Sequence, residues 1–422
     1  MTRRPTAQPA FGYGALLKEN RNYRYLWFGQ IVSLLGDWFN LVASASLVGL
    51  LTQSGLAVGS VFVVRMLAPF VVNPIAGVVA DRYSRKRILI TADLLRAASV
   101  LCFLFVRDAG DIWLLYALIA LQMALSGFFD PAHTSILPDV AGPEQLGAAN
   151  AVSSATWSVM LALGAALGGL FSGTFGMYPA FVLDAFTFLL SAALLAQIRV
   201  PKRPASEMGE KTVGAAVREY IYGLRFLGAN PDILVAALQK AMLALFLATA
   251  FQVIQVAIAQ RFFTIGEGGG ISMGMMFALT GVGSGIGPIL ARRFTGDDPA
   301  SLKKAIAIAY VVAIAGVAIT APLYSLPTVL LGSLVRALGS GVIWVFSTHL
   351  LLQMAPDEVR GRVFASDYMF FYLGSALSSS VIGAALDTSL SVSAIIWAMA
   401  ALSVVPMMLW TVWVARGSRE AV

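Results

Sequence analysis

Hydrophobic residues in this chain are grouped into long runs that short polar segments separate. A helix of roughly 20 apolar residues is long enough to cross the hydrocarbon core of a bilayer. Twelve such runs occur, at residues 25–52, 56–80, 88–107, 112–135, 147–174, 177–199, 232–260, 271–291, 304–323, 326–354, 362–387 and 391–415. The pattern predicts an all-α polytopic membrane protein with twelve transmembrane helices, embedded in a lipid bilayer.

One polar stretch, residues 200–230, is much longer than the others and divides the chain into halves of similar length. We therefore expect two six-helix bundles joined by a linker. The predicted parts are a cytoplasmic N-terminal tail at 1–24, an N-terminal bundle at 25–199, a cytoplasmic linker at 200–230, a C-terminal bundle at 231–415 and a cytoplasmic tail at 416–422.

Two short segments of the first half have weak counterparts in the second half. Residues 143–147 (PEQLG) resemble residues 356–361 (PDEVRG), and residues 77–82 (GVVADR) resemble residues 287–292 (GPILAR). The two offsets along the chain are nearly equal, which indicates a parallel duplication. Such a duplication predicts pseudo-symmetric bundles with a cavity between them.

Lys and Arg occur mainly in every second polar segment, beginning with the N-terminal one. The alternate segments hold only Arg107 and Arg261. Because cytoplasmic loops retain positive charge, we place both termini and the linker in the cytoplasm and the protein in the inner (cytoplasmic) membrane. The predicted cytoplasmic loop at 139–147 is an exception, since it has no Lys or Arg.

The composition narrows the function classes. The chain is 58% hydrophobic and 12% charged, and its net charge of +7 is spread over short loops, so we expect no nucleic-acid partner. Cys102 is the single cysteine, and His133 and His349 lie far apart in the chain. No phosphate-binding Gly-x-x-x-x-Gly-Lys-Ser/Thr loop is present. We predict no enzyme activity, no cofactor and no metal site.

The loop after the second run carries the most specific motif, Gly77-Val-Val-Ala-Asp81-Arg82-Tyr-Ser-Arg85-Lys86-Arg87. A carboxylate is unfavourable at the C-terminus of a helix, and the arginines that follow Asp81 can relieve it by pairing. We interpret Gly77, Asp81, Arg82 and Arg85 as a conformational latch. The alternative is a cytoplasmic loop that carries positive charge for topology alone.

This motif resembles the signature of the major facilitator superfamily, Gly-x-x-x-Asp-Arg-x-Gly-Arg-Arg/Lys, with Ser84 in place of a glycine. Softer similarities point to the drug-exporter branch that contains macrolide efflux proteins and enterobactin-type siderophore exporters. They are Gly36-Asp37-Trp38, Phe129-Asp130-Pro131-Ala132, Leu137-Pro138, Ala149-Asn150-Ala151 and Arg360-Gly361-Arg362-Val363. The antiporter signature of the fifth helix is incomplete, because Gly164 to Gly169 lacks its proline. The resemblance implies two bundles that alternate access to a central cavity.

Asp37 is the candidate for proton coupling. It lies about twelve residues into the first run, roughly 18 Å along a helix and hence near the middle of the membrane. Ionisable groups at this depth are costly and therefore functional candidates. A carboxyl group there could bind and release a proton in each cycle. The alternative is a structural Asp paired with an arginine or with backbone donors.

Other charged residues in the runs have several interpretations. Asp93 and Arg96 are three positions apart on one helix and are expected to pair, either in support of the latch or in the cavity wall. Asp130 and Arg362, near the inner ends of their helices, could join Asp81 and Arg85 in a charge network. We expect Lys240 to reach toward the membrane surface. Asp184 and Asp367 could each lie at the membrane interface.

Two arginines and several amide or aromatic side chains could line the substrate cavity. A buried guanidinium favours a carboxylate or an anionic substrate group; for the aromatic residues, packing and contact with lipid are the alternatives. The predicted cavity set is Trp38, Asn40, Arg65, Gln122, Gln252, Gln255, Arg336 and Phe370.

The sequence therefore favours a secondary transporter that exports small amphiphilic molecules such as drugs, macrolides or siderophores in exchange for protons. Its expected partners are a small-molecule substrate and protons, and we expect a monomer. Three alternatives stay open at this point: a lysophospholipid or lipid flippase on the same fold, a passive facilitator, and a membrane sensor that does not transport. The linker is too short to be a sensor's effector domain.

Overall fold

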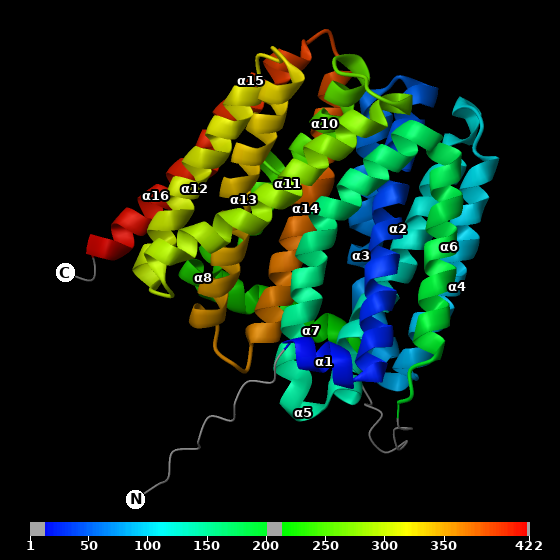
Figure 1. Ribbon diagram of the computed structural model, residues 1–422. Helices are drawn as coiled ribbons and strands as arrows, with labels where there is room; N and C mark the ends of the chain where they lie inside the picture. Colours follow the sequence, from blue (N-terminus) through cyan, green and yellow to red (C-terminus); the bar gives the residue numbers. More distant parts are fainter. Residues whose placement is uncertain (1–12, 201–212, 420–422) are drawn as a thin grey trace, which may run out of the picture.

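The computed structural model describes residues 13–200 and 213–419, and most of this part of the chain is helical (Figure 1). Twelve segments are long and apolar enough to cross a membrane, by length and composition. The predicted number of spans and the all-helical class are confirmed.

The first six spans form the N-bundle. Apart from a two-span element, each is a single helix, one of them extended by a short 3-10 turn. The elements are α2 (Arg21–Thr52), α3 (Gly55–Arg82), α4 (Arg85–Leu101) with η1 (Cys102–Phe105), α5 (Ile112–Phe175) preceded by η2 (Ala109–Asp111), and α6 (Met177–Ala196).

The last six spans form the C-bundle. The first span is broken into three helices and the last into two. The elements are α8 (Pro231–Ala237), α9 (Gln239–Phe246) and α10 (Thr249–Arg261), then α11 (Gly270–Thr295) preceded by η4 (Glu267–Gly269), α12 (Pro299–Thr320), α13 (Leu326–Met354) and α14 (Arg360–Leu386), and finally α15 (Val392–Leu402) with α16 (Val404–Arg419).

Two short helices lie together at one end of the molecule (Figure 1). They are α1 (Tyr13–Glu19) and α7 (Val213–Ala229), which fall in the predicted tail and linker. We call this end the linker end and the opposite one the distal end. The distal end contains the connection between α2 and α3, the turn at Gly176 and the loop after α14.

The predicted loop at 139–147 is wrong, because the fourth and fifth spans meet at a turn of one residue. Helical geometry in α5 is interrupted only at Gly142, with φ 69° and ψ 167°. These angles are accessible essentially to glycine alone. The absence of Lys and Arg from this segment therefore has a simple structural basis: hardly any loop exists to carry them.

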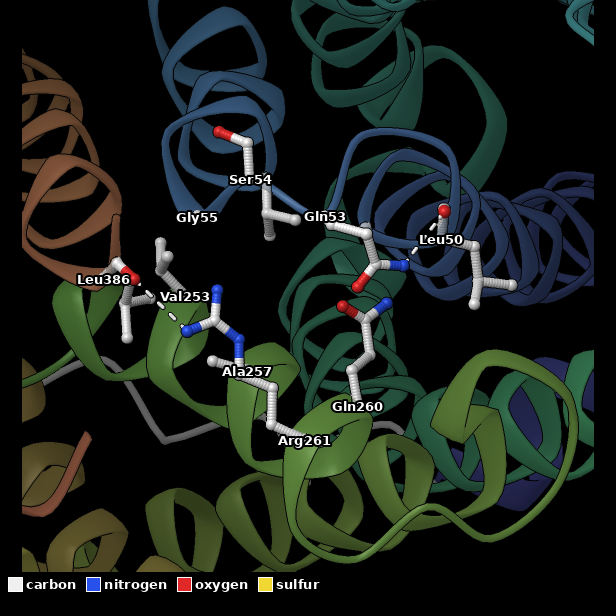
Figure 2. A pocket seen from close by; sticks show the side chains of 11 residues that line it. Leu50, Gln53, Ser54, Gly55, Val253, Ala257, Gln260, Arg261 and Leu386 are labelled. Atoms are coloured by element: carbon white, nitrogen blue, oxygen red, sulfur yellow. Dashed lines mark hydrogen bonds between the residues drawn. The ribbon is translucent and has the colours of Figure 1, made fainter. Parts of the chain in front are cut away.

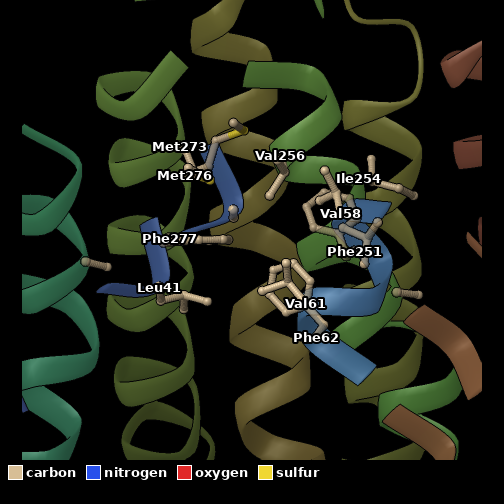
Figure 3. Close-up of a cluster of buried hydrophobic side chains, with 14 of the residues drawn as sticks. Leu41, Val58, Val61, Phe62, Phe251, Ile254, Val256, Met273, Met276 and Phe277 are labelled. Carbon is tan, nitrogen blue, oxygen red and sulfur yellow. The ribbon is translucent and has the colours of Figure 1, made fainter. Parts of the chain in front are cut away.

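Hydrophobic side chains fill the boundary between the bundles (Figure 3). Val58 and Phe62 of α3 and Phe251 of α10 belong to one buried cluster, together with Met273 and Phe277 of α11. All are at most 5% exposed. These apolar contacts between the halves can separate without stranding buried hydrogen-bonding groups.

Toward the distal end, the bundles approach each other at backbone distance. A Cβ placed on Gly169 of α5 would lie 2.3 Å from the Cα of Gly274 in α11, and one on Gly55 of α3 would lie 2.8 Å from the carbonyl oxygen of Gly383 in α14. Glycine is required at these positions because no side chain fits. We call these close contacts, with that of Gly49 against Gln260, the distal seam.

Candidate functional site

The N-bundle contains a buried guanidinium that two acids share. Arg96 of α4 donates from Nη2 to both carboxylate oxygens of Asp37 in α2, each at 2.9 Å, and from Nη1 to Asp93 at 3.2 Å. The Arg96 side chain is 2% exposed and that of Asp37 is 23% exposed. Asp37 is thus a paired carboxylate whose surface is still partly open. The predicted pair of Asp93 and Arg96 is present, and Asp37 of α2 is a third residue bound to it.

Aromatic rings cover the guanidinium. The centre of Arg96 lies 4.0 Å from the ring of Phe188 and 5.4 Å from that of Phe129. Rings exclude water and interact favourably with a cation, so they strengthen the attraction between Arg96 and its carboxylates. Ser33 accepts a further hydrogen bond from Arg96 Nη1 at 3.3 Å.

Asp184 of α6 is a further acid of this cluster that the sequence did not assign to it. It is fully buried rather than interfacial. Gly36 makes room for it, since a Cβ at that position would lie 2.3 Å from Asp184 Oδ1 and 2.0 Å from Thr187 Oγ1. The glycine of the Gly36-Asp37-Trp38 motif therefore brings two acids of different helices together. Asn40, also fully buried, lies next to Asp184.

Two more charged groups complete the cluster. Arg65 of α3 interacts electrostatically with Asp37 and Asp184. Asp130, whose side chain is exposed, interacts with Arg96 and Asp37. We call these residues the N-bundle charge cluster: Asp37, Arg65, Asp93, Arg96, Asp130 and Asp184. It has four acids and two cations, so carboxyl groups outnumber cations in this part of the N-bundle.

The C-bundle holds a separate ion pair. Lys240 of α9 donates to Asp367 of α14, and both side chains are at most 1% exposed. The Lys240 ammonium also lies 5.1 Å from the ring centre of Trp344 and 4.9 Å from that of Tyr368. The interpretations of Lys240 as reaching the membrane surface and of Asp367 as interfacial are wrong. The two residues pair across 127 positions of sequence.

Arg336 and Gln255 belong to the interior of the C-bundle. Arg336 donates to the Leu247 carbonyl oxygen at 3.0 Å and to Thr280 at 3.1 Å, and its guanidinium lies 4.5 Å from the Phe251 ring. Gln255 also donates to Thr280, at 3.2 Å. Arg336 thus binds neutral oxygens and a ring, and its Nε has no hydrogen-bond partner among the residues that the structure describes.

The remaining predicted cavity residues do not share one location. Trp38 lies at the boundary between the bundles, against Gly164 and 6.3 Å from the Phe277 ring. Gln122 is fully buried, and within the described part of the chain neither of its side-chain polar atoms has a hydrogen-bond partner. Gln252 is partly buried in α10, and Phe370 packs on the hydrophobic cluster beside α7 and α8.

The predicted latch residues have several different surroundings. The side chains of Asp81 and Arg82, and Gly77 as well, lie outside the part that can be described in side-chain detail. Arg85 donates to Asp139 at 2.8 Å and to the Ser135 carbonyl oxygen at 2.6 Å, both near the end of the fourth span. Asp139 was missed because it was assigned to a loop. Arg362 lies 4.9 Å from the ring of Tyr222 in α7.

Comparisons with known proteins agree with this architecture. Residues 26–323 match the family described as the Major Facilitator Superfamily. One relative, the uncharacterized MFS-type transporter YfiS of Bacillus subtilis, is 30% identical over 236 residues, which cover 55% of each chain. The multidrug efflux pump Tap of Mycolicibacterium fortuitum is 26% identical over 353 residues, 80% of this chain and 82% of that one.

The chain thus matches about half the length of the first curated relatives. Among solved structures, the nucleoside transporter NupG superposes with a TM-score of 0.73 at 13% identity, covering 93% of this chain and 98% of that one. At this identity the likeness concerns the fold alone. The similarity to an efflux pump supports the predicted resemblance to drug exporters.

Proposed function

Because this chain belongs to the Major Facilitator Superfamily, and is therefore a multi-pass membrane transporter rather than an enzyme, we propose that it exports small amphiphilic molecules in exchange for protons. The observation that carries the proposal is the N-bundle charge cluster, with more carboxyl groups than cations around Arg96. The relative named as a multidrug efflux pump supports export as the direction.

In this proposal Asp37 is the proton-binding group. Protonation would remove its charge and weaken both hydrogen bonds from Arg96, while Asp93 keeps the guanidinium in place. The partial exposure of Asp37 gives a proton a route that the buried Asp93 lacks. A proton shifts the equilibrium between two conformations only if it binds one better. The conformation that separates Asp37 from Arg96 is the one that binds the proton.

We assign the linker end to the cytoplasm, because Lys and Arg are concentrated there. The described structure then has its outer mouth closed by the distal seam. Substrate would enter from the cytoplasmic side between the bundles, and opening of the distal seam would release it. A monomer of two bundles, divided at residues 25–199 and 231–415, is sufficient for this cycle.

Reconstituted vesicles with an imposed pH gradient test the proposal. Macrolides, siderophores and lysophospholipids would first be ranked by their thermal stabilisation of the purified protein, and the best ligand would then be used in the transport assay. We expect accumulation that follows the gradient in the parent and equilibration without accumulation in Asp37→Asn. Asp297→Asn is the matched control, because Asp297 is 57% exposed and lies in a loop.

Other results would contradict the proposal. Lysophospholipid movement that ignores the pH gradient would favour a lipid flippase. Equilibration without accumulation in the parent would favour a passive facilitator. Normal gradient-driven transport by Asp37→Asn would remove Asp37 from the coupling step.

A further inference from the structure

One carboxylate at the distal end joins the two bundles. Asp387 directly follows α14 of the C-bundle, and it accepts three hydrogen bonds from the start of α3 in the N-bundle. The donors are the Ser54 hydroxyl at 2.6 Å, the Gly55 backbone N–H at 2.5 Å and the Leu56 backbone N–H at 3.0 Å. All three hydrogen bonds cross the boundary between the bundles.

The chemistry of a helix start explains why this contact is favourable. The first backbone N–H groups of a helix have no partner within it, and the positive end of the helix dipole attracts an anion. Ser54 is the N-cap residue of α3, and its hydroxyl accepts a hydrogen bond from the Ala57 N–H at 3.2 Å. Asp387 accepts hydrogen bonds from the N–H groups of the two preceding residues, Gly55 and Leu56. Both bundles therefore contribute to the cap of α3.

The surrounding residues hold Asp387 in this position. Arg261, at the end of α10, donates to the carbonyl oxygen of Leu386 at 3.2 Å, which fixes the last turn of α14 (Figure 2). Arg261 is also the cation that interacts with Asp387. On α3 and α14, Gly55 and Gly383 allow the backbones to touch beneath the carboxylate.

The seam is not filled completely at this point. A cavity of about 60 Å³ lies beside the contact, lined by polar groups of both bundles that include Gln53, Ser54, Gln260 and Arg261 (Figure 2). Its size and polar lining suit a few water molecules. Gln260 of the C-bundle donates to the Ser46 carbonyl oxygen of the N-bundle at 3.2 Å. Water can therefore replace these hydrogen bonds as the bundles separate.

We propose that Asp387 is a positioning residue for transport, which holds the distal mouth shut by capping α3 of the opposite bundle. The proposal rests on alternating access in the proposed function, but not on proton coupling. Since all three hydrogen bonds end on one side chain, separation of α3 from α14 breaks them together. The contact stabilises the closed state and is lost in the open one.

Thiol labelling tests this proposal without a transport substrate. In a Cys102→Ala background, Val58→Cys places one cysteine in the packed boundary, where Val58 is 5% exposed (Figure 3). A membrane-impermeant maleimide would be added from the distal side of the membrane. We expect slow labelling in this parent and labelling about tenfold faster in Asp387→Asn, since charge-assisted hydrogen bonds stabilise the closed state. Ser54→Ala should give a smaller increase.

Asp108→Asn is the matched control. Asp108 also caps a short helix at the distal end, by accepting from the Gly110 N–H at 2.8 Å, but both groups belong to the N-bundle. Its labelling rate should equal that of the parent. Circular dichroism and membrane abundance would show that each variant is folded.

The proposal is overturned if folded Asp387→Asn and Ser54→Ala both label at the parent's rate, or if Asp108→Asn accelerates labelling as strongly as Asp387→Asn. Faster labelling of Asp387→Asn supports it even where efflux ignores a pH gradient, since that result refutes proton coupling alone. The two proposals can therefore fail separately.

Discussion

Asp37 and Arg96 meet in the N-bundle with both carboxylate oxygens 2.9 Å from one guanidinium nitrogen. The two residues are 59 positions apart, on α2 and α4. The second nitrogen binds Asp93, so Arg96 would still have a carboxylate partner if Asp37 were protonated as proposed. The two nitrogens of one guanidinium thus bind carboxylates of two different helices.

Removal of the shared cation should destabilise the N-bundle strongly. Arg96→Met leaves Asp93 buried without its charge partner, and breaking a buried pair from one side costs about 3–5 kcal/mol. We expect a clearly lower midpoint of thermal unfolding. Addition of Asp93→Asn to Arg96→Met should recover part of the loss, because it removes the stranded charge. An unfolding midpoint for Arg96→Met equal to the parent's would contradict the described cluster.

The pair of Lys240 and Asp367 should behave as a unit in the C-bundle. Either Lys240→Met or Asp367→Leu alone should lower the free energy of unfolding by about 3–5 kcal/mol, whereas the double variant should be much closer to the parent. Chemical denaturation of the four proteins measures this coupling. The exposed pair of Arg292 and Asp297, 65% and 57% exposed, gives the comparison; its loss should cost less than about 1 kcal/mol. Additive effects at Lys240 and Asp367 would show that they do not interact.

Replacing Gly36 by alanine, the smallest possible enlargement, should destabilise the protein. In Gly36→Ala the new methyl group would meet Thr187 and Asp184 at 2.0 and 2.3 Å, and overpacking of this kind costs about 1–3 kcal/mol. Gly285→Ala is the control, since nothing lies within 4 Å of a Cβ at that helical position. Alanine there should be neutral or stabilising by up to about 1 kcal/mol. Thermal unfolding that ranks the two variants in the opposite order would refute the close packing of α2 on α6.

Acid should weaken the distal contact only at low pH. Partial burial acts to raise the pKa of Asp387, but hydrogen bonds from Ser54, Leu56 and Gly55, together with Arg261, outweigh it and lower the pKa. The unfolded value is about 3.9. A lowered folded pKa means that the contribution is complete above that value and is lost as the pH falls through the folded one.

Labelling at Val58→Cys should therefore be independent of Asp387 ionisation between about pH 5 and 8. At lower pH, pulse labelling with an acid-tolerant thiol reagent should accelerate in the parent and not in Asp387→Asn. A change in the parent near neutral pH that Asp387→Asn lacks would show that this carboxylate titrates much higher.

The sequence was sufficient for the architecture, because membrane spans are recorded in local hydrophobicity. The pairing of Asp93 with Arg96 also follows from position along one helix. The contacts of these residues with other helices do not follow from spacing along one helix. Asp184 and Asp367 were both predicted to be interfacial from their distance to a helix end. Residue spacing along a helix does not show how the helix is rotated or which side chains of other helices it contacts.

The same limit applies to the predicted cavity residues. Asn40, Gln255 and Arg336 are polar residues in apolar runs, but such residues can face a central cavity or a neighbouring helix of their own bundle. The structure gives all three neighbours within the bundle: Asp184 for Asn40, and Thr280 for the other two. Gly142 was missed for a different reason, because a turn of one residue has no polar segment to reveal it.

The sharp reversal at Gly142 ties the movements of two spans to each other. A connection without spare length cannot absorb sliding, so any shift of the fourth span along its axis pulls on the fifth. The fourth carries Asp130 beside the charged groups, whereas the fifth carries Gly169 against the opposite half of the molecule. In the proposed transport cycle, movement of the fourth span would therefore reach the fifth span through a single residue without a side chain.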